Sequence, residues 1–197
     1  ALLRKIFYDK RDSNNSLDRI NLLIIGGSQG AKIFDDLVKN TIIKLSKKYK
    51  LKIYQQTSYI NFESFKKIYE NNNINCELFD FNDDVINFMQ KSDLCITRAG
   101  ASTLAELNFI GIPYLAIPLP TAKDNHQFEN AYFYNKLGLN WLINQKKINE
   151  KLLFDKLINI IDNKEEYLAI KKNMKDFNYE NTWNNINLKI ISVINEN

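Results

Sequence analysis

Short apolar runs alternate with segments of helical period along most of this chain, and this alternation limits the folds that it can adopt. The runs are continuously apolar, as expected for strands buried on both faces of a sheet. They are residues 22–25, 51–54, 76–79, 94–97 and 113–117, with a weaker sixth at 141–143. Strands and helices in regular succession favour parallel pairing through right-handed crossovers. We therefore predict an α/β fold with a doubly wound parallel sheet of about six strands.

The segments between these runs carry apolar residues three or four positions apart, as on one face of a helix. The predicted faces are Ile33, Leu37, Ile42 and Leu45, then Phe62, Phe65 and Tyr69, then Val85, Ile86 and Met89, then Leu104, Leu107 and Ile110. From about residue 147 onward we predict closing helices, whose apolar residues are Leu152, Leu157, Ile160 and Ile161, then Ile186, Leu188, Ile191 and Val193. Because 197 residues with 45% hydrophobic content can form one substantial core, we expect residues 1–197 to be one domain.

Composition argues against several classes of protein. The net charge is +4, and the 27 basic residues are scattered among 23 acidic ones, which does not favour a nucleic-acid partner. Cys76 and Cys95 lie in apolar runs without a neighbouring Cys or His, so free buried thiols in a reducing cytoplasm are expected. No run approaches the ~20 apolar residues that cross a bilayer. Since the chain begins at Ala1, we expect it to be a soluble, excised piece of a longer protein.

Every loop of chemical interest follows a predicted strand. Residues 26–30, 81–84, 98–103 and 118–124 come after the first, third, fourth and fifth strands. The carboxyl ends of parallel strands meet at one edge of the sheet, and ligands bind there, next to the place where the strand order reverses. In the common order 3-2-1-4-5-6, the turns after the first and fourth strands flank that place. We therefore expect a ligand site at this edge.

The segment from Asp93 to Glu106 reads as a strand, a turn of small residues and a helix that opens with hydroxyls. Free N–H groups and the positive end of the helix dipole attract phosphate oxygens. Gly100 and Ala101 would let a ligand approach the main chain, and Glu106 would accept hydrogen bonds from sugar hydroxyls. The spacing of Thr103 and Glu106 also fits a capping box, in which the two side chains only satisfy backbone N–H groups.

The glycine-rich turn from Gly26 to Gly30 is a weaker signal. It lacks a dinucleotide fingerprint because Ile25 stands where a glycine is needed, and it lacks the Lys-Ser or Lys-Thr of a P-loop. Ser28 could donate to a phosphate. Alternatively, the glycines only allow the helix to pack closely on the sheet.

A helix predicted from Asp124 onward would bring His126, Gln127 and Asn130 together, and amides with an imidazole suit a hydroxyl-rich ligand. His126 is the only histidine, so a two-His metal site is excluded, and a lone histidine is more often structural than catalytic. Asp83 and Asp84 are better explained as carboxylates at a helix start than as metal ligands. We expect neither a metal nor another cofactor.

Four motifs occur in order, G-G-S-Q-G-A at 26–31, D-L-C-I-T-R-A-G-A-S-T-L-A-E at 93–106, G-I-P at 111–113 and A-x-D-N-H-Q-x-x-N-A at 122–131. Together they closely resemble the carboxyl-terminal half of the MurG family, bacterial N-acetylglucosaminyltransferases that complete lipid II in peptidoglycan synthesis. The resemblance spans roughly residues 4–143. It implies the Rossmann-like second domain of the GT-B architecture, which in this family binds UDP-N-acetylglucosamine.

By motif position, the resemblance implies donor-binding roles for Arg4, Ser28, Asn82, Ala101, Ser102, Thr103, Glu106, His126, Gln127 and Asn130. Arg4, Ser28 and the N–H groups of 101–103 would meet the diphosphate. Glu106 would hold the ribose, and the backbone of Asn82 would meet uracil. The three residues from 126 to 130 would face the sugar. After the second strand, residues 54–58 lack the family's usual glycine, so no role is assigned there.

The resemblance also implies an inverting transfer in which the muramyl C4 hydroxyl of lipid I attacks the sugar while UDP departs. The family's catalytic base and its surface for the lipid-linked acceptor belong to an amino-terminal domain that this chain lacks. We therefore expect the chain to bind donor but to be inactive alone, with the whole enzyme peripheral on the cytoplasmic side of the inner membrane. The alternatives are a donor-binding subunit of a split glycosyltransferase, or another UDP-sugar enzyme such as an epimerase. The absent dinucleotide fingerprint disfavours a nicotinamide-dependent oxidoreductase.

Overall fold

The computed structural model describes residues 19–26, 34–80, 85–177, 188 and 191–192. Its strands form a six-stranded sheet in the order β3-β2-β1-β4-β5-β6, and all neighbouring strands pair in parallel. The strands are β1 (Ile20–Ile25), β2 (Leu51–Gln56), β3 (Asn75–Phe79), β4 (Leu94–Thr97), β5 (Tyr114–Ala116) and β6 (Trp141–Leu142). The predicted α/β doubly wound sheet is thereby confirmed, and its order reverses between β1 and β4.

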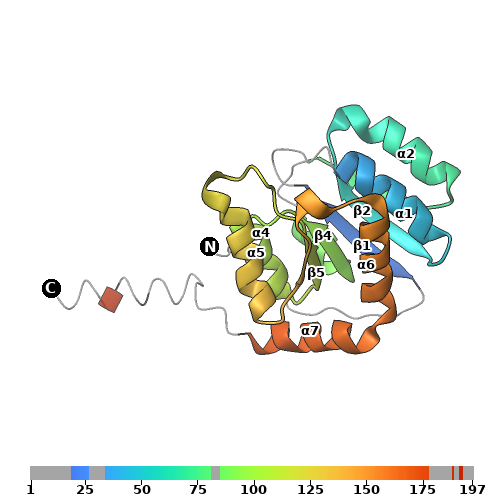
Figure 1. Cartoon of the computed structure of the whole chain (residues 1–197). Helices are drawn as coiled ribbons and strands as arrows, with labels where there is room; N and C mark the ends of the chain where they lie inside the picture. The colour runs from blue at the N-terminus through green and yellow to red at the C-terminus, as the bar shows by residue number, and fades with distance from the viewer. Residues whose placement is uncertain (1–18, 27–33, 81–84, 178–187, 189–190, 193–197) are drawn as a thin grey trace.

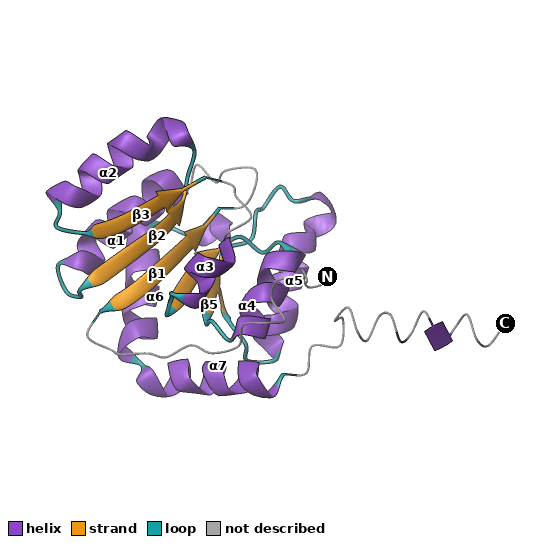
Figure 2. Cartoon of the chain, turned by 180° about the vertical axis from the view of Figure 1, so that it is seen from behind, coloured by secondary structure: helices purple, strands orange, loops and turns teal. Residues whose placement is uncertain are grey.

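Helices cover both faces of the sheet. Figures 1 and 2, which view the chain from opposite sides, show α1 and α6 over one face and α3 over the other. On the face of α3, this helix packs against α4, and α4 packs against α5. The helices are α1 (Lys39–Ser46), α2 (Phe62–Asn71), α3 (Val85–Gln90), α4 (Ala101–Ile110), α5 (His126–Lys136), α6 (Glu150–Asp162) and α7 (Lys164–Asp176).

The core lies between these layers. Leu23, Ile24, Ile53, Ile96 and Leu115 are fully buried in the four central strands. This explains why their runs are continuously apolar, since both faces of each strand are covered. The backbone hydrogen bonds of the sheet continue one residue beyond the ends of β5 and β6. Ile117 N donates to Thr97 O at 2.8 Å, and Ile143 N donates to Ala116 O at 3.0 Å.

The first helical segment differs from its predicted face. Residues Phe34–Val38 form a wider turn of π type before α1 begins at Lys39. A wider turn shifts the buried stripe by one position, so Phe34 and Val38 are buried and Leu37 is only half-buried. Ile42 and Leu45 are buried as predicted. Ile33 lies outside the described residues.

The closing helices begin near the predicted place. Asn149 caps α6, because its side chain accepts a hydrogen bond from Leu152 N at 2.9 Å. This start leaves Leu152 exposed and buries Leu153 instead, which corrects the predicted face. Leu188 and Ile191 are exposed. Among the described residues, helices with the length and apolarity of a membrane span are absent.

Candidate functional site

The turn that connects β4 to α4 has each of its peptide groups held in place. Arg98 N donates to Ile25 O at 3.2 Å, and the Thr97 hydroxyl donates to Arg98 O at 2.8 Å. Ala99 N donates to Gln127 Oε1 at 3.3 Å, and Asn130 Nδ2 donates to Ala99 O at 3.1 Å. The turn lies where β1 and β4 meet, so it occupies the edge position that the strand order predicts for a ligand.

The N-cap residue of α4 provides no side-chain cap for the first turn of this helix. Gly100 is its N-cap and Ala101 its first residue, and within the described residues no side-chain hydrogen bond caps this end of the helix. The leading N–H groups of a helix have no intrahelical acceptor, and here Ala101 and Ser102 are exposed. The arrangement can therefore offer donors and a positive dipole end to an anion.

The capping-box alternative is excluded for this helix. A capping box would need Thr103 at the N-cap and Glu106 at the third helical position. Instead the helix begins at Ala101, so both residues lie within it. Glu106 is only 2% exposed. A buried carboxylate requires polar partners, so Glu106 is not a solvated helix residue.

The amides of α5 hold the turn. Gln127 Oε1 accepts from Leu119 N at 3.0 Å as well as from Ala99 N, so one oxygen joins the loops after β4 and β5. Within the described residues, Gln127 Nε2 has no partner, which leaves it available to a ligand. The predicted sugar contacts of Gln127 and Asn130 remain predictions, and the structure adds their bonds to Ala99.

The approach to α5 is irregular. The helix begins at His126, not at Asp124, because Asp124 and Asn125 adopt left-handed backbone with φ of 51° and 55°. Such conformations cost of order 1–2 kcal/mol for residues other than glycine. His126 is exposed, and its Nδ1 lies 2.6 Å from Lys123 O. The histidine thus closes the strained turn.

Arg98 is a site residue that sequence reasoning missed. Its side chain is buried, and Nη1 donates to Ile117 O at 3.0 Å and to Gln145 Oε1. The guanidinium carbon lies 5.1 Å from the centroid of the Phe34 ring. Burial lowers the pKa of Arg98 to about 10, so the group stays charged at neutral pH. The sequence feature that could have identified Arg98 is its place as a basic residue directly after a buried strand.

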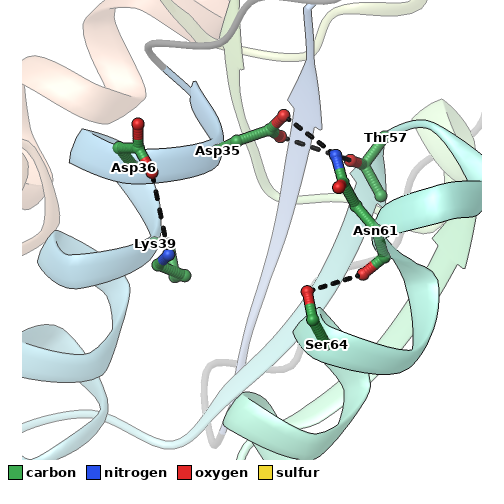
Figure 3. Close-up of polar contacts among 6 residues, drawn as sticks. All are labelled: Asp35, Asp36, Lys39, Thr57, Asn61 and Ser64. Atoms are coloured by element: carbon green, nitrogen blue, oxygen red, sulfur yellow. Dashed lines mark hydrogen bonds and ion pairs between the residues drawn. The ribbon is translucent and has the colours of Figure 1, made fainter.

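A second polar cluster, defined by Asp35, Thr57 and Asn61, lies beyond the end of β2 (Figure 3). The Asp35 carboxylate accepts from the Thr57 hydroxyl at 3.2 Å and from Asn61 Nδ2 at 3.3 Å. Burial raises the pKa of Asp35, and the hydrogen bond from Thr57 offsets part of that rise. The sequence assigned no role to residues 54–58, so this cluster was also missed.

Several predicted site residues cannot be placed. Arg4, Ser28 and Asn82 lie outside the described residues, as do Asp83 and Asp84. A pocket of about 440 Å³ lies at the opposite edge of the sheet, where Arg19, Lys47 and Asn73 are among its lining residues. None of the motif residues lines that pocket.

Known proteins similar to this chain agree in sequence and in fold. Residues 21–184 match the model of the glycosyltransferase family 28 C-terminal domain. A UDP-N-acetylglucosamine--N-acetylmuramyl-(pentapeptide) pyrophosphoryl-undecaprenol N-acetylglucosamine transferase of Pelagibacter ubique is 85% identical over all 197 residues, which cover 55% of that protein. Its namesake in Rickettsia bellii is 41% identical over 164 residues, or 81% of this chain and 46% of that protein.

Two solved structures have the same fold. The crystal structure of Acinetobacter baumannii MurG matches with a TM-score of 0.77 and 25% identity, over 97% of this chain and 53% of that one. A UDP-GlcNAc 2-epimerase of Neisseria meningitidis, bound to UDP-GlcNAc, matches with a TM-score of 0.64 and 15% identity. The match covers 93% of this chain and 46% of the epimerase chain. The chain thus spans about half the length of the relatives it matches. The resemblance to the carboxyl-terminal half of MurG is confirmed, and the chain belongs to glycosyltransferase family 28, of which it contains the C-terminal domain.

Proposed function

We propose that this chain is the donor-binding half of an inverting glycosyltransferase. It binds UDP-N-acetylglucosamine, and the whole enzyme transfers N-acetylglucosamine to the muramyl C4 hydroxyl of lipid I, which forms lipid II. The observation that carries the proposal is the bonded turn at 98–100, which presents an uncapped helix start at the reversal of the strand order. The donor and the acceptor in this proposal are those named for the similar proteins of Pelagibacter ubique and Rickettsia bellii.

Each part of the donor has a partner in this proposal. The N–H groups of residues 101–103 hold the diphosphate, with Arg4 and Ser28 beside them, and Glu106 holds the ribose. The backbone of Asn82 meets uracil. His126, Gln127 and Asn130 face the sugar, and the available Nε2 of Gln127 supports this role. Fixed N–H donors stabilise the charge that develops on the departing UDP, in the manner of an oxyanion hole.

The remaining steps belong to the other half of the enzyme. The base that activates the C4 hydroxyl and the surface that binds the lipid-linked acceptor lie in an amino-terminal domain. That domain also makes the main contact with the cytoplasmic side of the inner membrane. In this proposal, residues 1–197 form one donor-binding domain and the chain alone transfers no sugar.

Calorimetry on the chain tests the proposal. We expect UDP to bind more tightly than ADP, because the uracil and ribose contacts are specific. The substitution Glu106→Gln keeps the shape of the side chain but removes its charge, and it should weaken UDP binding by about 1–3 kcal/mol. Circular dichroism and thermal unfolding serve as the folding control. Equal affinity for UDP and ADP contradicts the proposal, and a variant that melts earlier but binds normally contradicts the ribose role of Glu106.

A further inference from the structure

Arg98 is the one basic side chain that is buried among the described residues, with 8% of its surface exposed. Its partners there are neutral oxygens, the Ile117 carbonyl at 3.0 Å and the side-chain carbonyl of Gln145. The ion pairs found in the described part of the chain use lysines, and none involves Arg98. The described part of the chain therefore holds a buried positive charge and supplies no carboxylate to it.

A buried charge without a countercharge is costly, because the low local dielectric neither solvates nor screens it. The side chain nevertheless stays protonated at neutral pH, since its pKa remains about 10. Phe34 supports the guanidinium from one side, at 5.1 Å from its ring centroid, and gives only a modest cation–π stabilisation. The cost is offset if an anion binds nearby.

The position of Arg98 indicates which anion would bind near it. The residue begins the turn whose next members, Ala99 and Gly100, lead into the uncapped start of α4. Its backbone bonds to Ile25 of β1, while its side chain reaches the loops after β5 and β6. One residue therefore ties together the ends of four strands at the edge where the donor binds in the proposed function.

We propose that Arg98 is a positioning residue and a fixed countercharge for the diphosphate of the donor. It locks the turn that aims the α4 N–H groups, and it places a positive charge behind them without touching the ligand. This inference rests on the proposed donor site. Because the departing UDP carries more negative charge than the bound UDP-sugar, the countercharge favours the leaving group over the donor.

The test compares three ligands of decreasing charge on the intact chain. UDP, UDP-N-acetylglucosamine and uridine are titrated against the wild type and Arg98→Met, by calorimetry for the nucleotides and by NMR shifts for uridine. We expect the Kd of UDP to rise about tenfold or more and that of UDP-N-acetylglucosamine to rise less, because a charge in a partly desolvated site acts several times more strongly than in water. The Kd of uridine should stay within about twofold, because uridine carries no charge.

Two further variants distinguish the effect of the charge of Arg98 from the effect of its shape. Arg98→Lys keeps the charge but loses the flat contact with Phe34, so it should retain part of the preference for UDP over uridine. Lys146→Met removes the same charge from an exposed neighbour of Gln145, and it should change UDP affinity by less than about twofold because exposed charges are screened.

The outcomes are distinguishable. If the wild type binds no UDP, both the proposed function and this inference are wrong. If the wild type binds UDP but Arg98→Met weakens UDP and uridine alike, or weakens neither, only the countercharge role is overturned. Should Arg98→Met fail to fold, Arg98→Lys is used in its place. Equal losses of affinity for UDP and uridine in that variant contradict the proposal.

Discussion

The oxygen and the nitrogen of the Gln127 side chain differ in their partners. Its oxygen accepts hydrogen bonds from Ala99 N and Leu119 N, and its nitrogen is left for a ligand within the described part of the chain. The family resemblance predicts only a sugar contact. The bond to Ala99 joins residues 28 positions apart, and no local pattern in the sequence reports such a pair.

Asp35 gives a prediction about pH. Its pKa is higher in the folded chain than in the unfolded chain, mainly because of burial. Its contribution to stability is therefore fully present below the unfolded pKa of about 3.9 and is lost as the pH rises through the folded value. We expect Asp35→Asn, which cannot ionise, to gain stability relative to the wild type as the pH rises from about 4 to 7. Urea denaturation at a series of pH values measures this difference.

The matched control is Asp36→Asn, since the Asp36 side chain is 71% exposed and pairs only loosely with Lys39 at 3.9 Å. Its stability difference from the wild type should change little over the same range. A difference for Asp35→Asn that stays constant with pH contradicts the burial argument.

At the scale of elements, the junction between β4 and α4 shows whether folding or ligand binding requires a glycine at position 100. Gly100 has φ of −65° and ψ of 133°, which any residue adopts. Among the described residues, a Cβ atom added there would meet only Thr103 Oγ1, at an ordinary 3.8 Å. The described part of the fold therefore does not require this glycine, whereas the proposed close approach of a diphosphate would.

We predict that Gly100→Ala leaves the free energy of unfolding unchanged or raises it by about 0.4–1 kcal/mol, because alanine restricts the unfolded chain. The same substitution should weaken UDP binding about tenfold, since its methyl group obstructs the phosphate. Thermal unfolding and calorimetry measure the two effects.

Gly111 provides the opposite case, because it ends α4 with a left-handed φ of 82°. Gly111→Ala should destabilise the fold by about 1 kcal/mol and leave the UDP affinity of the folded chain unchanged. Normal UDP binding by Gly100→Ala contradicts the proposed approach of the ligand.

The elements themselves were largely predictable. Each of the six apolar runs lies on a strand, because burial on both faces leaves a continuous pattern that needs no long-range information. Boundaries and faces were less accurate where local geometry departs from the ideal. The wide turn before α1 shifted a buried face to Phe34 and Val38, and the left-handed Asp124 and Asn125 delayed the start of α5.

At the scale of the whole molecule, the site depends on contacts between distant segments. Arg98 and Gln145 are 47 residues apart, and Asp35 and Thr57 are 22 apart. The motifs identified the loops that carry the site, since loops after parallel strands share one edge. They could not identify the buried side chains that fix those loops, because such pairs exist only once the sheet has formed.

The length of the chain yields a prediction about activity. It spans 55% of a relative to which it is 85% identical. We expect the 197-residue chain to bind UDP-N-acetylglucosamine but to release no UDP when a lipid I analogue is added, because the proposed function assigns the base and the acceptor surface to the other half. A coupled assay for UDP release measures this, with the full-length relative as the positive control. Acceptor-dependent release by the chain alone contradicts this division of roles.

The two outermost strands of the sheet bear on how the chain behaves in solution. At one border β6 has only two residues, and at the other β3 exposes Asn75 and Glu77, with Glu77 paired to Lys52. Short or charged border strands are poor templates for pairing with a second copy. Concentrated samples should therefore resist fibril-like association, which suits the millimolar spectroscopy that weak ligands demand.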